Sequence, residues 1–178
     1  MELLADKPAA REVAREVGIP VVDGSVSHLD DAGLLEAADQ MGYPVMLKAV
    51  AGGGGMGIRA AHSRRELEEA IPGARQEAQA AFGDDDVYLE RLVEDARHIE
   101  VQLLGDTNGH VIHLGERECS IQRRHQKLIE EAPSRALDDE LRQRIHRAAV
   151  QIGEAVGYVS AGTVEFLLDD EGRFTFME

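Results

Sequence analysis

A glycine-rich run at residues 52–57, Gly-Gly-Gly-Gly-Met-Gly, restricts the fold more than any other feature of the sequence. It follows an apolar segment, Val45–Val50, and precedes Ile58–Ala61, and both flanks have the composition of strands. Glycines let main-chain N–H groups converge on an anion, so such a loop can cradle phosphates. A dinucleotide fingerprint would continue into a helix and a P-loop would end in Lys-Ser/Thr, and this loop does neither. We predict a flap between two strands, with a plain turn as the alternative.

Helix and strand signals along the chain predict an α+β fold. Start and stop signals indicate four helices, at about residues 6–17, 30–41, 63–82 and 138–156. Strands are expected at residues 45–50, 58–61 and 87–93, with hairpins at 99–104/110–114 and 163–168/174–177. The polar segment from 115 to about 135 has too many functional side chains for a plain connection. The pattern favours two lobes with largely antiparallel sheets and helices packed to one side.

Composition excludes several classes of protein. A formal net charge of −15 argues against a nucleic-acid partner, because phosphate-backbone binding needs clustered Lys and Arg. The sequence contains no apolar run of membrane-spanning length and no signal-peptide pattern, so no membrane association is expected. The single Cys119 excludes an internal disulfide and fits a reducing compartment, which predicts a cytoplasmic protein.

Two cationic features are candidates for anion binding. Lys48 interrupts the apolar strand before the glycine run, where a buried amine needs a negative partner such as a phosphate. The alternative is a surface lysine at a sheet edge. The segment Gln122–Lys127 is the densest basic stretch of an acidic chain and suggests an anion site, with a local salt-bridge patch as the alternative. Lys7, in a helix's first turn, would by itself be a solvated charge.

A pair of glutamates is the candidate metal site. Glu165 interrupts a buried-looking strand, and the short turn at Asp169–Arg173 brings Glu178 level with it to within one residue of register. Adjacent carboxylates repel each other unless a cation or proton separates them. Oxygen ligands of this kind suit Mg²⁺ or Mn²⁺. The alternative is two exposed glutamates at strand ends.

Taken together, these motifs resemble the biotin carboxylase family of ATP-grasp enzymes, over nearly the whole chain. The block from Glu116 to Pro133 is far more specific than the glycine run. The resemblance lies in Asp6-Lys7, residues 43–49 with the glycine loop, and residues 97–102, 116–127, 130–133 and 162–167. The resemblance implies an ATP-grasp fold truncated at both ends, with lead-in helices at about 1–42, a lid lobe at about 43–93 and part of a base lobe at about 94–178.

The resemblance also implies roles for individual residues. Lys127 would be the catalytic residue and would bind bicarbonate or the transferred phosphoryl group. Glu165 and Glu178 would hold the metal, and Glu165 would also contact ATP. The remaining ATP contacts implied by the resemblance are Lys7 and Lys48 at the phosphates, Gly54 and Gly55 in the flap, Glu90, Arg91, Leu92 and Val93 at the adenine, and His98, Gln122 and His125 near the ribose and phosphates.

Enzymes of this family are ligases that use MgATP to activate bicarbonate as carboxyphosphate, which then carboxylates biotin on a carrier protein. The expected cofactors are ATP, Mg²⁺ or Mn²⁺, and carrier-bound biotin, and the expected partners include a biotin carboxyl carrier and a carboxyltransferase component. The isolated chain is expected to be inactive, because it stops before an Asn and an Arg of the family's active site. Met56 stands where the family usually has Lys or Arg.

Two alternatives remain open. The chain could belong to another ATP-grasp ligase of the carbamoyl-phosphate synthetase type, although Gln122–Lys127 and the following Glu-Ala-Pro favour biotin carboxylase. It could instead be a nucleotide-binding module without chemistry of its own. ATP binding without hydrolysis would support the module.

Overall fold

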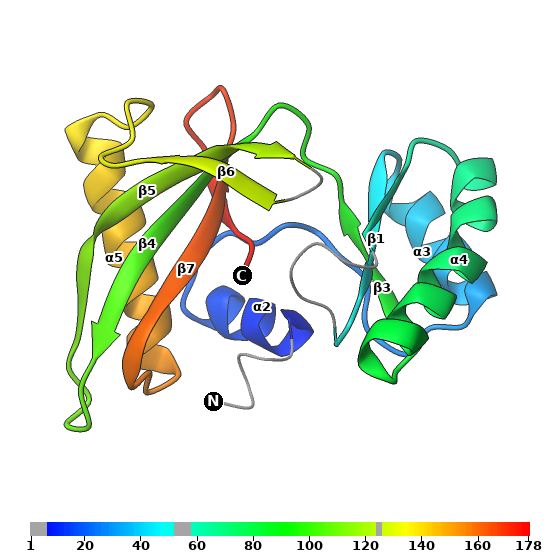
Figure 1. The fold of residues 1–178 in the computed structure, drawn as a ribbon, viewed down its shortest axis with the longest axis horizontal. Helices are drawn as coiled ribbons and strands as arrows, with labels where there is room; N and C mark the ends of the chain where they lie inside the picture. The colour runs from blue at the N-terminus through cyan, green and yellow to red at the C-terminus, as the bar shows by residue number, and fades with distance from the viewer. Residues whose placement is uncertain (1–6, 52–57, 124–125) are drawn as a thin grey trace. The chain divides into compact units, whose positions relative to one another are not determined.

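The computed structural model describes residues 7–51, 58–123 and 126–178 (Figure 1). The chain divides into two compact units, one formed by residues 22–92 and the other by residues up to 21 together with 93–178. This division differs from the predicted one, because the expected lead-in segment 1–42 is split between the units. Each unit buries a hydrophobic core of its own.

The unit of residues 22–92 is a small antiparallel sheet covered by two helices. Its strands lie in the order β2-β1-β3. The bounds are α3 Asp31–Met41, β1 Val45–Ala49, β2 Arg59–Ala61, α4 Arg64–Phe82 and β3 Val87–Arg91. The side chain of Ser63 accepts a hydrogen bond from the Glu66 amide and begins α4, as the capping pattern predicts. Leu47, Leu67 and Leu89 are fully buried between the sheet and the helices.

The second unit is a five-stranded antiparallel sheet in the order β6-β5-β4-β7-β8, with helices α2 and α5 (Figure 1). The bounds are α2 Lys7–Glu16, β4 Arg97–Gly105, β5 Val111–Arg123, β6 Gln126–Glu131, α5 Asp139–Ala155, β7 Ser160–Leu168 and β8 Phe174–Phe176. Both predicted hairpins are confirmed, β4–β5 and β7–β8. The polar segment 115–135, which was not assigned to strands, largely forms the second half of β5 and all of β6. Charged residues suit β5 because they form ion pairs with β4, Glu118 with Arg97 and Arg117 with Glu100.

The five-stranded sheet has one apolar and one polar face, because successive strand residues point to opposite sides. On β4, Ile99, Val101 and Leu103 are buried with Phe166 of β7 in the core that includes α5 and α2. The helices therefore cover one face, as the sequence predicts. His98 and Glu100 alternate with these residues and lie on the other face. The apolar core thus fixes the sheet that holds the polar side chains in place.

Among the described residues, no helix has both the length and the apolar character needed to cross a lipid bilayer.

Candidate active site

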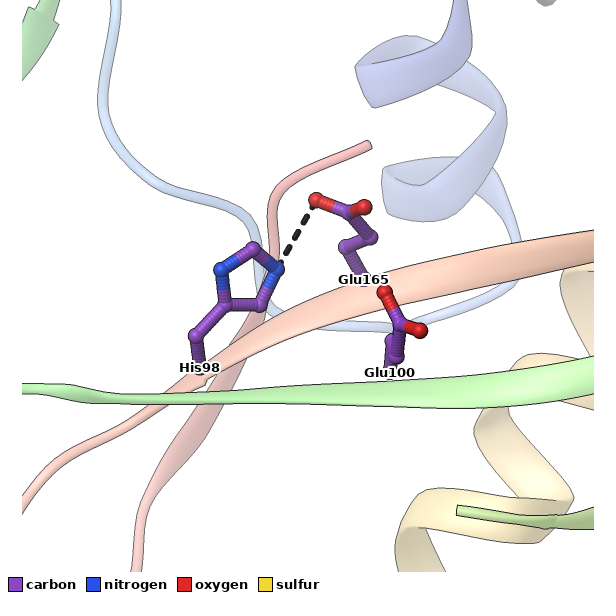
Figure 2. A group of neighbouring side chains, drawn as sticks. All are labelled: His98, Glu100 and Glu165. Carbon is purple, nitrogen blue, oxygen red and sulfur yellow. Dashed lines mark hydrogen bonds and ion pairs between the residues drawn. The ribbon is translucent and has the colours of Figure 1, made fainter. Parts of the chain in front are cut away.

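Three side chains meet on the polar face of the five-stranded sheet (Figure 2). His98 and Glu100 are two residues apart on β4, and Glu100 lies directly opposite Glu165 of β7 in the strand register. One ligand atom of each residue lies within 4.8 Å of those of the other two. Since His98 is 9% exposed and Glu100 2% exposed, the charges in this group need partners.

Hydrogen bonds connect this group to β5 and β6. The Lys127 ammonium donates to Glu165 Oε1 at 2.7 Å and forms an ion pair with Glu100. His98 Nε2 lies 2.8 Å from Glu165 Oε2, and Gln122 Nε2 lies 2.8 Å from His98 Nδ1. The Gln122 amide donates to Nδ1, so the proton of a neutral imidazole is on Nε2, facing the carboxylate. Four of the residues predicted to form the site, His98, Gln122, Lys127 and Glu165, therefore lie in one network.

The pKa values show how strongly this network favours ionised groups. Burial by itself would raise the pKa of Glu165, but hydrogen bonds from His98 and Lys127 outweigh it and lower that pKa to about 2. Burial would likewise lower the pKa of Lys127, but hydrogen bonds to Glu100 and Glu165 raise it instead. At neutral pH the site therefore holds a charged ammonium between two carboxylates.

Glu100 and Arg117 belong to the site although the sequence analysis gave them no role. Arg117 forms an ion pair with Glu100 and lies 3.4 Å from Glu130 Oε2. The hydrogen bonds from Lys127 and Arg117 lower the pKa of Glu100 against the opposing effect of burial. A sequence signal was present, because polar residues alternate with apolar ones from His98 to Gln102. That pattern predicts a polar strand face, although it does not identify the partners across the sheet.

The donor set fits a magnesium ion. Carboxylate oxygens are ligands that Mg²⁺ prefers. Two carboxylates of this group each have an oxygen within 4.8 Å of the other. Glu178 pairs with Glu165 through the main chain, since the Glu165 amide donates to the Glu178 carbonyl at 2.6 Å. The predicted register of these two residues is therefore confirmed. Two clusters of potential ligand atoms occur among the described residues: His98 with Glu100 and Glu165, and Glu100 with Cys119 and Glu130. The Glu178 side chain is in neither.

In the unit of residues 22–92, Lys48 lies on β1 and is 8% exposed. Its ammonium forms an ion pair with Glu90 of β3, and the Tyr88 hydroxyl donates to Glu90 Oε1 at 2.8 Å. The alternative of a surface lysine is therefore wrong. The family resemblance implies a nucleotide site that includes both Lys48 and Glu90, and the structure brings these residues together on adjacent strands.

The other predicted site residues are only partly described. The Arg91 side chain donates to the Met41 carbonyl, and the Leu92 amide donates to the Pro44 carbonyl at 3.1 Å. Val93 is the first residue after the unit that ends at Leu92. Lys7 begins α2, but its side chain is outside the described part of the structure. The remaining predicted residues, Gly54, Gly55 and His125, lie outside the described residues.

Comparison with known proteins identifies the family. Residues 6–178 match the model of the carbamoyl-phosphate synthase L chain, ATP binding domain. The chain belongs to this family. Within the family it is similar to biotin carboxylases: a biotin carboxylase of Nostoc sp. is 51% identical over 179 residues, which cover 100% of this chain and 40% of the relative. The predicted resemblance to biotin carboxylase is confirmed.

Solved structures confirm the ATP-grasp fold. A biotin carboxylase–β,γ-ATP complex from Campylobacter jejuni superimposes with a TM-score of 0.96 at 47% identity, over 99% of this chain and 40% of that one. The biotin carboxylase domain of Hydrogenobacter thermophilus 2-oxoglutarate carboxylase, in complex with MgADP, ADP and bicarbonate, gives a TM-score of 0.96 at 48% identity. It is matched over 99% of this chain and 39% of its own. The chain thus spans about two fifths of the length of these relatives.

Proposed function

We propose that this chain is the ATP- and bicarbonate-binding part of a biotin carboxylase. Such a ligase uses MgATP to activate bicarbonate as carboxyphosphate, which then carboxylates biotin on a carrier protein. One observation carries the proposal: a charged Lys127 is held between Glu100 and Glu165 on the polar sheet face. The lysine ammonium is a compact point charge, so a small anionic substrate can approach it once a divalent cation offsets the two carboxylates.

In this proposal Lys127 binds bicarbonate or the transferred phosphoryl group. Phosphoryl transfer requires mainly positioning and charge neutralisation, and a rigidly held ammonium provides both. Glu100 and Glu165 keep the ammonium charged and aimed, since their hydrogen bonds raise its pKa. His98 and Gln122 form a hydrogen-bonded pair beside it, with polar atoms for the ribose and phosphate region.

Magnesium would be held by Glu165 and Glu178, and Glu100 adds a third carboxylate nearby. When bound, the ion supplies positive charge that allows phosphate oxygens to lie next to carboxylates. For the nucleotide, we assign Lys48 to the phosphates and residues 90–93 to the adenine. These assignments rest on the family resemblance, which also gives phosphate contacts to Lys7, Gly54, Gly55 and His125.

The full enzyme would have further partners that this chain alone does not identify. Relatives named biotin carboxylase and pyruvate carboxylase imply a biotin carrier domain, and a pyruvate carboxylase of Bacillus subtilis is 50% identical. A carboxyltransferase component and a cytoplasmic location remain predictions. Because the chain covers only 40% of the Nostoc relative, we expect nucleotide binding but no biotin carboxylation by these 178 residues. A carbamoyl-phosphate synthetase-type activity is the less favoured alternative, since the relatives that are about 50% identical over the whole chain include biotin carboxylases.

Calorimetric titration of the chain with MgADP tests the nucleotide site. We expect saturable binding, weakened at least about tenfold by Lys48→Gln, because a lost charge-assisted contact is worth about 1.5–3 kcal/mol. Arg135→Gln is the matched control, since Arg135 is exposed and no ion pair involves it among the described residues. A folded chain that does not bind MgADP, or equal affinities for the two variants, would contradict the proposal.

Bicarbonate-dependent ATP cleavage by the intact parent enzyme tests the chemistry. Lys127→Gln should lower the rate of this cleavage by about 10²- to 10³-fold, the range seen when one preorganised electrostatic group is removed. MgADP affinity should change much less, and Lys127→Arg should recover part of the cleavage. If the glutamine variant cleaves ATP at the normal rate with bicarbonate, Lys127 does not have the assigned role.

A further inference from the structure

A second concave site lies in the same unit as the candidate active site but shares no residue with it. It is a hollow of about 630 Å³ between α5, the turn after α2 and the β7–β8 hairpin, which we call the α5 hollow. Its apolar lining includes Ile19, Ala148 and Phe174, which are all buried core residues. The volume is within the range of about 300–1,000 Å³ that is usual for small-molecule sites.

Two arginines of α5 line this hollow. Arg144 and Arg147 are three residues apart, so they lie on the same side of the helix. The Arg144 guanidinium carbon lies 5.6 Å from the centroid of the Phe174 ring, over an aromatic surface. Neither arginine forms an ion pair with any carboxylate in the described part of the chain. The third arginine of the hollow, Arg173, is already paired with Asp169 at 2.7 Å and with Glu171 at 2.8 Å.

These two uncompensated charges lie in one hollow, whereas most cations among the described residues are paired with carboxylates. The chain has 34 acidic and 19 basic residues, so carboxylates are available to most cations. Arg142, on the same helix, bonds to both Glu116 and Asp139. A single solvated arginine on a surface would need no explanation, but two that line one concave apolar hollow create a local excess of positive charge. Guanidinium groups are well suited to phosphate because they donate two parallel hydrogen bonds.

We propose that the α5 hollow binds a small phosphorylated molecule with a flat apolar or aromatic body. The phosphate would lie against the guanidinium groups of Arg144 and Arg147, and the body would lie on Phe174 and Ile19. Gln151 also lines the hollow and offers an amide for a polar substituent of the ligand. Both parts of the recognition are required, since charge alone would accept any anion and the apolar lining alone would accept any hydrophobe.

Phenyl phosphate is the probe that tests both parts at once. It is titrated into the full 178-residue chain and followed by amide resonances of Ala148, Gln151 and Thr175, which line the hollow. We expect saturable shifts at these amides, with at least about tenfold weaker binding of inorganic phosphate and of phenol than of phenyl phosphate. Added NaCl should weaken the binding, because the guanidinium contacts are exposed.

Variants locate the site. Arg147→Ala should weaken phenyl phosphate binding at least about tenfold, and Arg147→Lys should weaken it less, because lysine keeps the charge but loses the paired donors. Arg135→Ala is the control for loss of one exposed arginine, and it should bind normally. Thermal unfolding of each variant establishes that it is folded. The proposal is overturned by absence of binding at millimolar probe, by equal affinities of Arg147→Ala and the control, or by shifts confined to the network around Lys127.

Discussion

Replacement of Glu165 by Gln tests the charge network of the candidate site most directly. The amide keeps the size of the side chain but removes the negative charge that bonds to His98 and Lys127. The pKa of Glu165 is lowered from 4.5 to about 2, and each pKa unit corresponds to about 1.36 kcal/mol. The carboxylate therefore stabilises the folded unit by at most about 3 kcal/mol, and we expect Glu165→Gln to cost about 1–3 kcal/mol at pH 7.

The pH dependence of this cost follows from the direction of the shift. Because the folded pKa of Glu165 lies below the unfolded value of 4.5, its contribution is complete above pH 4.5 and is lost as the pH falls toward about 2. At pH 3 less than half of the difference between wild type and variant should remain. The quantity to follow is the difference in unfolding free energy between wild type and Glu165→Gln. Other carboxylates titrate in both proteins, so their contributions cancel in that difference.

Urea unfolding, followed by the amide resonances of β4 and β7, measures the unfolding free energies of wild type and Glu165→Gln. These signals report on one unit only. Glu154→Gln is the matched control: Glu154 is exposed on α5, and the change should stay within about 0.5 kcal/mol. The reasoning is refuted if Glu165→Gln also stays within that limit at pH 7. It is equally refuted if the loss at pH 3 is as large as the loss at pH 7.

Two further changes test packing and thiol chemistry. Gly105→Ala would place a Cβ atom 1.9 Å from the Tyr158 carbonyl oxygen. We therefore expect the free energy of unfolding, measured by thermal unfolding, to fall by more than about 2 kcal/mol. Leu104→Ala, at an exposed neighbour, is the control and should change the melting temperature little. Burial raises the pKa of the Cys119 thiol to about 11, so alkylation at pH 8 should be much slower in the folded chain than in urea. Equal rates in the two conditions would contradict its burial.

Local sequence signals predicted the parts of the fold that depend on near neighbours. The hairpin turn at Asp169–Arg173 is short, so strand alternation was enough to bring Glu178 level with Glu165. The capping residue Ser63 similarly marked the start of α4. These features need only a few residues of sequence, and each was predicted correctly.

Interactions between distant segments could not be predicted in the same way. The pairing of Glu100 with Lys127 and Arg117 depends on how β4, β5 and β6 are aligned. Register shifts occur between Val101 and Leu103 and again beyond Glu118, and each changes which residues face one another. No single-sequence pattern encodes these shifts. Glu100 was therefore visible as a polar residue on a strand, but its partners were not.

The distribution of charge explains why magnesium belongs in the proposed function. Within the described residues, Lys48 is paired with Glu90, and Lys127 is shared by Glu100 and Glu165. Both of these lysines are thus already compensated. A triphosphate brought to Lys127 would meet two carboxylates that stay ionised at neutral pH, and like charges in a partly buried site repel strongly. A divalent cation removes that repulsion by binding carboxylate and phosphate oxygens together. The same carboxylates that hold the lysine in place would therefore make the proposed nucleotide site dependent on a metal ion.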